Sequence, residues 1–392
     1  MSKLEELIQQ YCPDGVEYKP IGDYLKYEQP TKYLVESTKY DDSYPTPVLT
    51  AGQSFILGYT KETDGIYKAS KDSPVIIFDD FTTSLHWVEF SFKVKSSAMK
   101  MLTPVDETKA LFRYLYYCMK NIMYVPGDHT RQWIGTYSQF EIPIPSLPVQ
   151  EEIVRVLDTF TELQAELQAE LQKRLQQYNY YRDNLLSFEG RTDVEWKKLG
   201  EVASITTGRR FVRTDIKESG VPCFHYGDLY TYYGLTATQT KGYLDEELAK
   251  KLRFAQPNDV VVVCAGENDM DLGVGVAWLG NEPAVVHDAC CILHHNQNPR
   301  YISHLLRTHN YHLQMKKYVK NGKISSLPAS GLAEAMIPIP SLEEQEKIAS
   351  ILDRFDTLTC DLIAGLPAEM EKRRQQYEYY RDKLLTFKKK EA

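Results

Sequence analysis

Apolar residues recur at helical spacing along two long stretches of the chain. In the first stretch they stand every three or four positions from Ile153 to Tyr178, and neither glycine nor proline follows before Gly190. This pattern predicts one helix that begins near Gln150 and runs for roughly 38 residues, or about 57 Å at 1.5 Å per residue.

The second stretch has the same spacing from Ile348 to Ile363 and is predicted to begin near Glu344. It then meets Gly365-Leu366-Pro367, where the helix should break and restart with Pro367 at its first position. One apolar stripe is typical of a simple hairpin core. Two stripes at equivalent places favour an antiparallel coiled coil between them.

A six-residue motif, I-P-I-P-S-L, occurs at 142–147 and again at 337–342. The offset of 195 continues through Phe160 and Phe355, and 12 of these 19 positions are identical. A second block, 176–188, matches 375–387 at 10 of 13 positions with an offset of 199. Similarity at this level excludes chance, so the chain contains an internal duplication.

The duplication includes a short upstream anchor, since Val16–Asp23 matches Val194–Glu201. Between anchor and motif the two halves show no evident similarity, so a shared framework surrounds two unlike inserts. Each motif reads as the last strand of its insert. The predicted segments are a globular domain 1–145, a helical spacer 146–189, a second globular domain 190–340 and a second spacer 341–392. We expect an α+β fold with two globular domains separated by long antiparallel coiled-coil helices in pseudo-two-fold arrangement.

Composition is that of a globular protein, with 43% hydrophobic and 26% charged residues. The net charge of −8 argues mildly against a nucleic-acid partner, but acidic residues cluster locally, for example at 343–346. Seven cysteines without C-x-x-C spacing predict reduced thiols and a cytoplasmic location. The longest apolar run, Val260–Ala265, is too short for a membrane span, and the polar N-terminus is unlike a signal peptide.

Sequence motifs for catalysis are missing. The chain has no N/D-P-P-Y/F motif and no G-x-x-x-x-G-K-S/T loop, and Gly273–Val276 fits a strand or bulge. Asp79-Asp80 follows an apolar run, so a strand-end turn is favoured over a nuclease site. Cys290-Cys291 with His294-His295 could suggest zinc, but neighbouring strand residues point to opposite faces, which favours a buried strand. The chain is therefore expected to be non-catalytic and without a metal.

These features resemble the specificity subunit of a type I restriction–modification system, most closely the type IC group. The resemblance covers nearly the whole chain. It rests on the I-P-I-P-S-L motifs, the L-D-x-F stretches at 157–160 and 352–355, the Q-Y-x-Y-Y-R-D-x-L-L-x-F blocks and a short-period helical array. In such proteins each unlike domain is a target-recognition domain that reads one half of a split DNA site. The helices act as a ruler and dock methyltransferase subunits.

The resemblance implies several partners for the chain: double-stranded DNA, two methyltransferase subunits and two motor-nuclease subunits, with no membrane. It also implies that S-adenosylmethionine, ATP and magnesium are bound by the partner subunits and that this chain holds no cofactor. The complex would methylate adenine N6 and cut DNA with ATP. Two unlike inserts imply an asymmetric target. A module of a methyltransferase-only system and a coiled-coil scaffold for protein partners remain alternatives.

A four-residue array, E-L-Q-A, repeats through 162–173, where relatives carry a T-A-E-L type repeat. One unit of helix adds about 6 Å and turns about 400°, a net of roughly 40°. That is close to the turn of one base pair, so each unit could adjust the spacing by one base-pair step. Helical low complexity on a solvated surface is the alternative.

Base edges are read by Arg, Lys, Asn, Gln, Ser or Thr on loops, and phosphates by cations or free amides. The candidates in the first domain are Thr50, Gly52, Gln53, Lys93, Lys95, Ser97, Lys100, His129, Arg131 and Gln132. Those in the second are Thr207, Gly208, Arg209, Arg210, Arg213, His225, Tyr226, Lys320, Lys323 and Ser325. An ordinary surface role is the alternative for each residue taken singly.

The duplicated blocks also contain tyrosine clusters, and base stacking is one interpretation of them. Because both copies are the same, they cannot carry information about one half-site. We expect helix packing or partner docking from Tyr178, Tyr181, Arg182, Tyr377, Tyr380 and Arg381.

Overall fold

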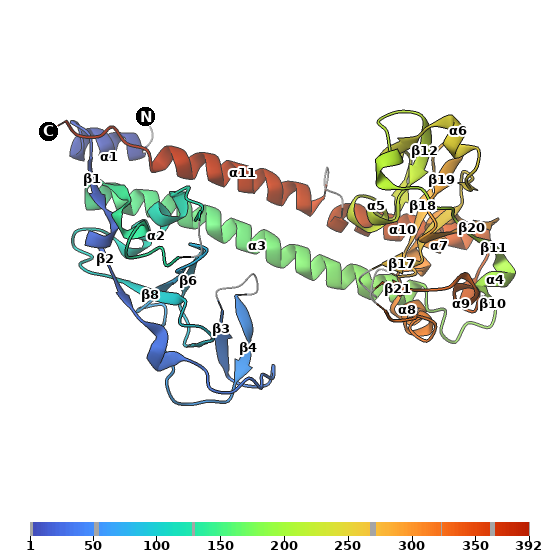
Figure 1. Cartoon of the computed structure of the whole chain (residues 1–392), viewed down its shortest axis with the longest axis horizontal. Helices are drawn as coiled ribbons and strands as arrows, with labels where there is room; N and C mark the ends of the chain where they lie inside the picture. Colours follow the sequence, from blue (N-terminus) through green and yellow to red (C-terminus); the bar gives the residue numbers. More distant parts are fainter. Residues whose placement is uncertain are drawn as a thin grey trace. The chain divides into compact units, whose positions relative to one another are not determined.

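Two compact units make up the chain (Figure 1). Unit 1 comprises Met1–Ala165 together with Lys372–Ala392, and unit 2 comprises Glu166–Glu371. The computed structural model describes residues 3–50, 55–127, 130–266, 272–322, 324–360 and 365–391. Each unit therefore combines one insert with helical segments from both copies of the repeat.

A two-stranded antiparallel ladder opens and closes each insert. The strands are β1 (Glu17–Pro20) with β9 (Glu141–Ile144) in unit 1, and β10 (Glu195–Lys198) with β22 (Met336–Ile339) in unit 2. Tyr18 faces Pro143 in the first ladder and Trp196 faces Pro338 in the second, so the register is the same in both. The prediction that each I-P-I-P motif forms the last strand is confirmed.

Unit 1 contains a four-stranded sheet and a three-stranded sheet. The orders are β2 (Leu25–Glu28), β8 (Met99–Pro104), β5 (Val75–Asp79), β6 (Leu85–Val88), and β4 (Ile56–Thr60), β3 (Thr46–Leu49), β7 (Lys93–Val94). Side chains alternate along β5. Ile76 and Phe78 join the core with α2 (Phe112–Asn121), and Val75 and Ile77 join the core with the smaller sheet. A strand buried on both faces explains its uninterrupted apolar run.

Unit 2 has a five-stranded sheet beside a four-stranded one. The orders are β11 (Ala203–Thr207), β20 (Cys290–His295), β16 (Val260–Val263), β18 (Gly275–Trp278), β13 (Thr236–Ala237), and β14 (Gly242–Leu244), β12 (Val221–Phe224), β19 (Ala284–Val286), β15 (Phe254–Ala255). A short ladder joins β17 (Ala265–Gly266) to β21 (Ser325–Ser326). The unit also contains the short helices α4 (Leu199–Val202), α5 (Tyr226–Thr231), α6 (Glu246–Ala249), α7 (Pro299–Leu305), α8 (His309–Met315) and α9 (Ala329–Ala333).

Buried polar contacts repeat in the two frameworks. The Gln150 amide nitrogen donates to the Pro145 carbonyl at 2.8 Å, and that of Gln345 donates to the Pro340 carbonyl at 2.9 Å. Both glutamines are fully buried. Each amide oxygen also accepts from the backbone amide of the residue before a helix of its insert, Leu111 before α2 and Asn298 before α7. The duplicated glutamine therefore ties the strand exit to the insert without leaving a buried polar group unpaired.

Three long helices carry the duplicated blocks: α3 (Leu147–Leu185), α10 (Leu342–Cys360) and α11 (Leu366–Leu384). The continuous first helix is confirmed at 39 residues, although it starts three residues before Gln150. The second stretch forms two helices, as the Gly-Leu-Pro sequence predicted. One detail was wrong, because Pro367 is the second helical residue and not the first. A proline tolerates either place, since the first-turn amides have no partner inside the helix.

The helices pair across the two copies of the repeat. In unit 1 the Phe160 ring of α3 packs against Tyr380 of α11, with centroids 5.4 Å apart. In unit 2 the Phe355 ring of α10 packs against Tyr181 of α3, also at 5.4 Å. α3 thus meets α11 near its own start and α10 near its own end, so the pairing is antiparallel. Each unit takes its first helical block from one copy and its second from the other.

Two predictions of local structure are confirmed. Cys290–His295 is strand β20, with both cysteines buried. Asp79 ends β5, and its carboxylate accepts from the amides of Phe81 and Thr82, as a strand-end turn requires. Within the part of the chain that the structure describes, no helix is long and apolar enough to cross a bilayer.

Candidate nucleic-acid interface

Three loops of unit 2 that the sequence singled out converge on one pocket of about 350 Å³. Arg210 and Arg213 come from the segment after β11, and His225 and Tyr226 from the start of α5. Ile324, which is 60% exposed, comes from the loop before β21. Segments more than a hundred residues apart therefore form one surface.

The segment after β11 is held by a close approach to β19. The Gly208 amide donates to the Cys290 carbonyl at 2.9 Å, and the Arg209 amide to the Val286 carbonyl at 3.0 Å. A Cβ at Gly208 would lie 2.3 Å from the carbonyl oxygens of Val286 and His287. The predicted DNA contact at Gly208 is corrected to a packing role. Only a residue without a side chain lets the segment after β11 come this close to the end of β19, and this close packing buries the glycine.

Two arginines and one carboxylate, that of Asp288, line this pocket. Arg210 and Arg213 are exposed, and neither forms an ion pair within the described residues. Arg209 is also exposed, and its guanidinium donates to the Lys251 carbonyl at 2.8 Å. Thr207 is exposed at the end of β11, where its carbonyl accepts from Arg253. Free guanidinium groups beside a pocket suit phosphate or a base edge.

The floor of the pocket is aromatic. The rings of His225 and His287 lie 4.9 Å apart, and the Tyr226 ring lies 5.2 Å from His287. Burial lowers the pKa of His225, and the neighbouring His287 lowers it further. Burial also lowers the pKa of His287, against the opposing effect of Asp288. Both imidazoles are therefore neutral at neutral pH. Phe211, His287 and Asp288 also line this pocket, and nothing in their local sequence pattern indicates it.

The remaining candidates of unit 2 surround β21. Lys320 is exposed, and its backbone amide donates to the Ser326 carbonyl at 2.8 Å. Ser325 is buried and pairs with Gly266 in the ladder, so its predicted DNA contact is corrected to a structural role. Lys323 lies outside the described residues.

In unit 1 two predicted lysine contacts are corrected. The Lys93 ammonium is buried and lies 2.8 Å from the Glu62 carboxylate and 2.7 Å from the Asp64 carbonyl. Lys100 is fully buried, and its ammonium lies 3.1 Å from the Asp80 carboxylate. Each long side chain points inward to a partner, so neither cation is at the surface.

Asp80 also anchors the loop that carries Arg131. Its carbonyl accepts from the Gln132 amide at 2.8 Å, and its carboxylate accepts from the Trp133 amide at 2.9 Å. Gln132 is buried, and its amide oxygen accepts from the Tyr124 hydroxyl, so its predicted DNA contact is corrected to a loop-holding role. Arg131 stays exposed, with its guanidinium 4.0 Å from Asp80. His129 lies outside the described residues.

Two other candidates of unit 1 lie side by side. β3 and β7 are parallel, with Leu49 opposite Val94, so Thr50 and Lys95 follow at the same sheet edge. The Lys95 amide donates to the Leu49 carbonyl at 2.8 Å, and its side chain is exposed, as is that of Ser97. Gly52 and Gln53 lie outside the described residues.

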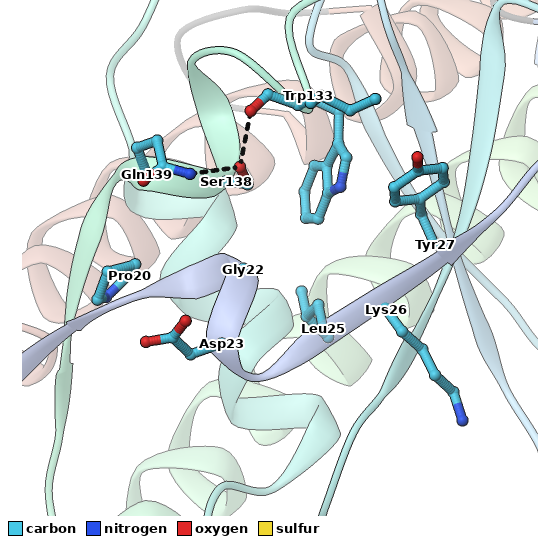
Figure 2. Close-up of a pocket in the computed structure, with 10 residues that line it drawn as sticks. Pro20, Gly22, Asp23, Leu25, Lys26, Tyr27, Trp133, Ser138 and Gln139 are labelled. Atoms are coloured by element: carbon cyan, nitrogen blue, oxygen red, sulfur yellow. Dashed lines mark hydrogen bonds between the residues drawn. The ribbon is translucent and has the colours of Figure 1, made fainter.

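A cleft of about 510 Å³ adjoins the Arg131 loop in unit 1. Figure 2 shows Trp133 and Leu25 pointing toward its middle and Lys26 pointing away from it. Ser138 accepts from the Gln139 amide at 3.1 Å and donates to the Ile134 carbonyl at 3.3 Å. Lys26 is an exposed cation that the sequence interpretation missed, because it lies in the strand just after the duplicated anchor.

The tyrosine clusters lie at the helix pairs. Tyr178 is buried and its hydroxyl lies 3.1 Å from His304, whereas its counterpart Tyr377 is partly buried against the core of unit 1. The Arg182 and Arg381 guanidinium groups lie 5.5 and 5.9 Å from the Tyr178 and Tyr377 ring centroids. Tyr181 and Tyr380 keep more than a third of their surface exposed.

The fold and these surfaces together define an internally duplicated protein with two unlike recognition surfaces. The sequence profile of the type I restriction modification DNA specificity domain matches residues 13–177 and 192–372. The chain belongs to this family, and it is the DNA specificity subunit of a type I restriction–modification system, the non-catalytic component.

Similar proteins agree with this membership. A specificity subunit of a type I restriction enzyme from Escherichia coli is 44% identical over 410 residues, which cover 100% of this chain and 98% of the relative. A putative specificity subunit from Haemophilus influenzae is 28% identical, with 98% of each chain covered. The solved S subunit of a Mycoplasma genitalium type I system shares the fold, with a TM-score of 0.57 at 14% identity, covering 95% of this chain and 96% of that one.

Proposed function

We propose that each unit reads one half of an asymmetric bipartite DNA site and that the paired helices set the gap between the halves. The half contacted by unit 1 is called half-site one, and the half contacted by unit 2 is called half-site two. The observation that carries the proposal is the convergence of the 206–213, 225–229 and 320–326 loops, with free arginines, on one surface of unit 2.

The two recognition surfaces occupy corresponding places on the framework. Arg131 lies 11 residues before Ile142 of β9, and Ile324 lies 13 residues before Ile337 of β22. Arg131 corresponds to Ser326 at the offset of 195. A common scaffold that presents different side chains at one position is suited to reading two different base sequences.

The helical framework exposes one leucine and one tyrosine at equivalent positions in each unit. Unit 1 has Leu163 and Tyr379, and unit 2 has the equivalent Leu358 and Tyr180. The two leucines are 38% and 39% exposed and the two tyrosines 62% and 65%. Equivalent exposed apolar residues in a duplicated framework suit two copies of the same partner. We propose that the helical framework docks one methyltransferase subunit in each unit and that these residues contact it.

The chemistry of the assembled complex belongs to its partners in this proposal. The methyltransferase subunits bind S-adenosylmethionine and methylate adenine N6. Two motor-nuclease subunits join them with ATP and magnesium. The specificity subunit contributes DNA binding and spacing in the cytoplasm and holds no cofactor itself.

Methylome sequencing tests the proposal directly. Cells that lack other adenine methyltransferases would express this chain with its methyltransferase, and every N6-methyladenine would be mapped. We expect a single asymmetric motif with two specified halves and an unspecified gap of constant length. The variant Arg210→Ala with Arg213→Ala should relax or abolish half-site two and leave half-site one specified. A palindromic motif, or equal loss at both halves, would contradict the proposal.

A further inference from the structure

The pocket at the Arg210–Arg213 loop in unit 2 is concave. Its volume of about 350 Å³ lies near the lower end of the range of small-molecule sites, about 300–1,000 Å³. Bases that stay stacked in a duplex are read by groups that protrude into a groove. On a bound duplex, the groups that protrude far enough to enter a hollow of this size are a phosphate and an extrahelical base.

The positions of the charged and aromatic side chains in the pocket indicate which of these two groups it is suited to bind. Its floor contains Phe211, His225 and His287, each no more than 9% exposed, and these rings contact one another at 4.9–6.1 Å. Tyr226 adds a half-buried ring 4.7 Å from His225. Burial lowers the pKa of both histidines, so these aromatic rings carry no charge at neutral pH. The cations stand at the exposed rim, on Arg210 and Arg213.

A phosphate alone would be held best by cations on the floor. An aromatic floor with a cationic rim instead matches a nucleotide, whose base is flat and apolar and whose phosphates are charged. Enzymes that take a base out of the stack hold it between aromatic or apolar side chains and read its edge by hydrogen bonds.

We propose that this pocket receives one extrahelical nucleobase of half-site two, with Arg210 and Arg213 at the phosphates that flank it. The inference rests on the function proposed above. Asp288 lines the pocket, and its carboxylate lies 3.0 Å from the His287 ring nitrogen. A carboxylate accepts hydrogen bonds, so the pocket suits a base with an exocyclic amino group. No covalent bond changes in this step, which consists of unpairing, rotation and stacking.

A mismatch scan tests the proposal with the full-length chain in complex with its methyltransferase partner. Duplexes carry the recognised site with one mismatch at each position of half-site two in turn, and the protein-facing base is kept. At the extrahelical position the mismatch removes the pairing that must be broken. We expect binding there to tighten about tenfold, which corresponds to about 1.4 kcal/mol.

Pocket variants assign this gain to unit 2. Tyr226→Ala should remove the gain at that position, and Tyr232→Ala, a matched loss of a 59% exposed tyrosine outside the pocket lining, should keep it. Ala289→Phe adds a ring at a small lining residue and should remove the gain by filling the pocket. A mismatch at the base that the methyltransferase itself extrudes should also tighten binding, but this effect should persist in Tyr226→Ala and Ala289→Phe. The two extruded positions can therefore be told apart.

Three results would overturn the inference. In the first, no mismatch in half-site two tightens binding in a way that depends on Tyr226 and Ala289. In the second, Arg213→Ala weakens matched and mismatched duplexes alike while Tyr226→Ala has no effect, which assigns the pocket to a phosphate. In both cases the wild-type complex still selects half-site two, and the proposed function stands. In the third, the complex selects neither half-site, and the inference falls together with the proposed function.

Discussion

Lys100 lies beneath the Arg131 loop of unit 1 and supports it through one ion pair. The Lys100 ammonium is 3.1 Å from Asp80, and the two side chains are 0% and 1% exposed. Asp80 accepts hydrogen bonds from the backbone amides of Gln132 and Trp133. The substitution Lys100→Met keeps an aliphatic side chain and removes the charge, so among the described cations the buried Asp80 carboxylate keeps only the exposed Arg131 guanidinium, 4.0 Å away.

Removing one partner of a buried ion pair costs about 3–5 kcal/mol, because the remaining charge stays desolvated. We expect Lys100→Met to lower the free energy of unfolding of unit 1 by this amount and to leave unit 2 unchanged. Hydrogen exchange measured by mass spectrometry at several urea concentrations reports on peptides of each unit separately. Half-site one should lose specificity in methylome sequencing, because Arg131 depends on the same loop.

The matched control is Lys95→Met, which removes an exposed lysine that follows β7 in the other sheet of unit 1. We expect it to change the free energy of unfolding by less than about 0.5 kcal/mol. The double variant Asp80→Asn with Lys100→Met removes both charges and keeps an oxygen that accepts from the Trp133 amide. It should recover most of the loss. A loss below about 1 kcal/mol for Lys100→Met, or a double variant no more stable than the single one, would refute this reasoning.

Three other outcomes follow from the same structure. Arg213→Ala should lower the slope of log affinity against log salt by about 0.9 if Arg213 contacts one phosphate. Lys217→Ala, which removes a cation already paired with Asp245, is the control, and an unchanged slope for Arg213→Ala would exclude the phosphate contact. Deleting Glu166–Ala169 should shorten the gap in the methylated motif by about one base pair, because four helical residues give a net turn of roughly 40°. A gap of unchanged length would contradict the ruler. The Arg155 guanidinium lowers the pKa of Glu152 to about 2 from an ordinary value near 4.5. A depressed folded-state pKa stabilises the fold above the ordinary value, so unit 1 should lose stability as the pH falls from about 4.5 to about 2. Urea titrations across this range should show a smaller loss for Glu152→Gln, and a profile of unchanged slope would argue against the contribution.

The helices and the framework could be predicted from the sequence because they depend on local periodicity. Apolar residues every three or four positions from Ile153 onward specify a helix whatever packs against it. The duplicated I-P-I-P motif marks equivalent strands in both halves. The strand at Val75–Asp79 was recognised from its apolar run and the aspartates that end it.

The binding surfaces were predicted less well, because residue type does not reveal direction. In the sequence, Lys93 and Lys100 are cations in a polar segment, as Arg210 and Arg213 are. In the structure, however, the two lysine ammonium groups point inward to Glu62 and Asp80. A long aliphatic side chain permits either direction, and the choice depends on a carboxylate distant in sequence. Ser325 and Gln132 were misassigned because backbone pairing with segments distant in sequence, at Gly266 and Asp80, holds them in the interior.

The sequence by itself determined that this protein has a duplicated framework, two unlike inserts and long amphipathic helices. Only the tertiary structure decided the register of the paired helices. The sequence predicts that helices of the two copies pair, but apolar periodicity does not say which turns meet. Packing brings Phe160 against Tyr380 and Phe355 against Tyr181. The same non-local geometry brings three loops of unit 2 to one pocket, and no local pattern records that proximity.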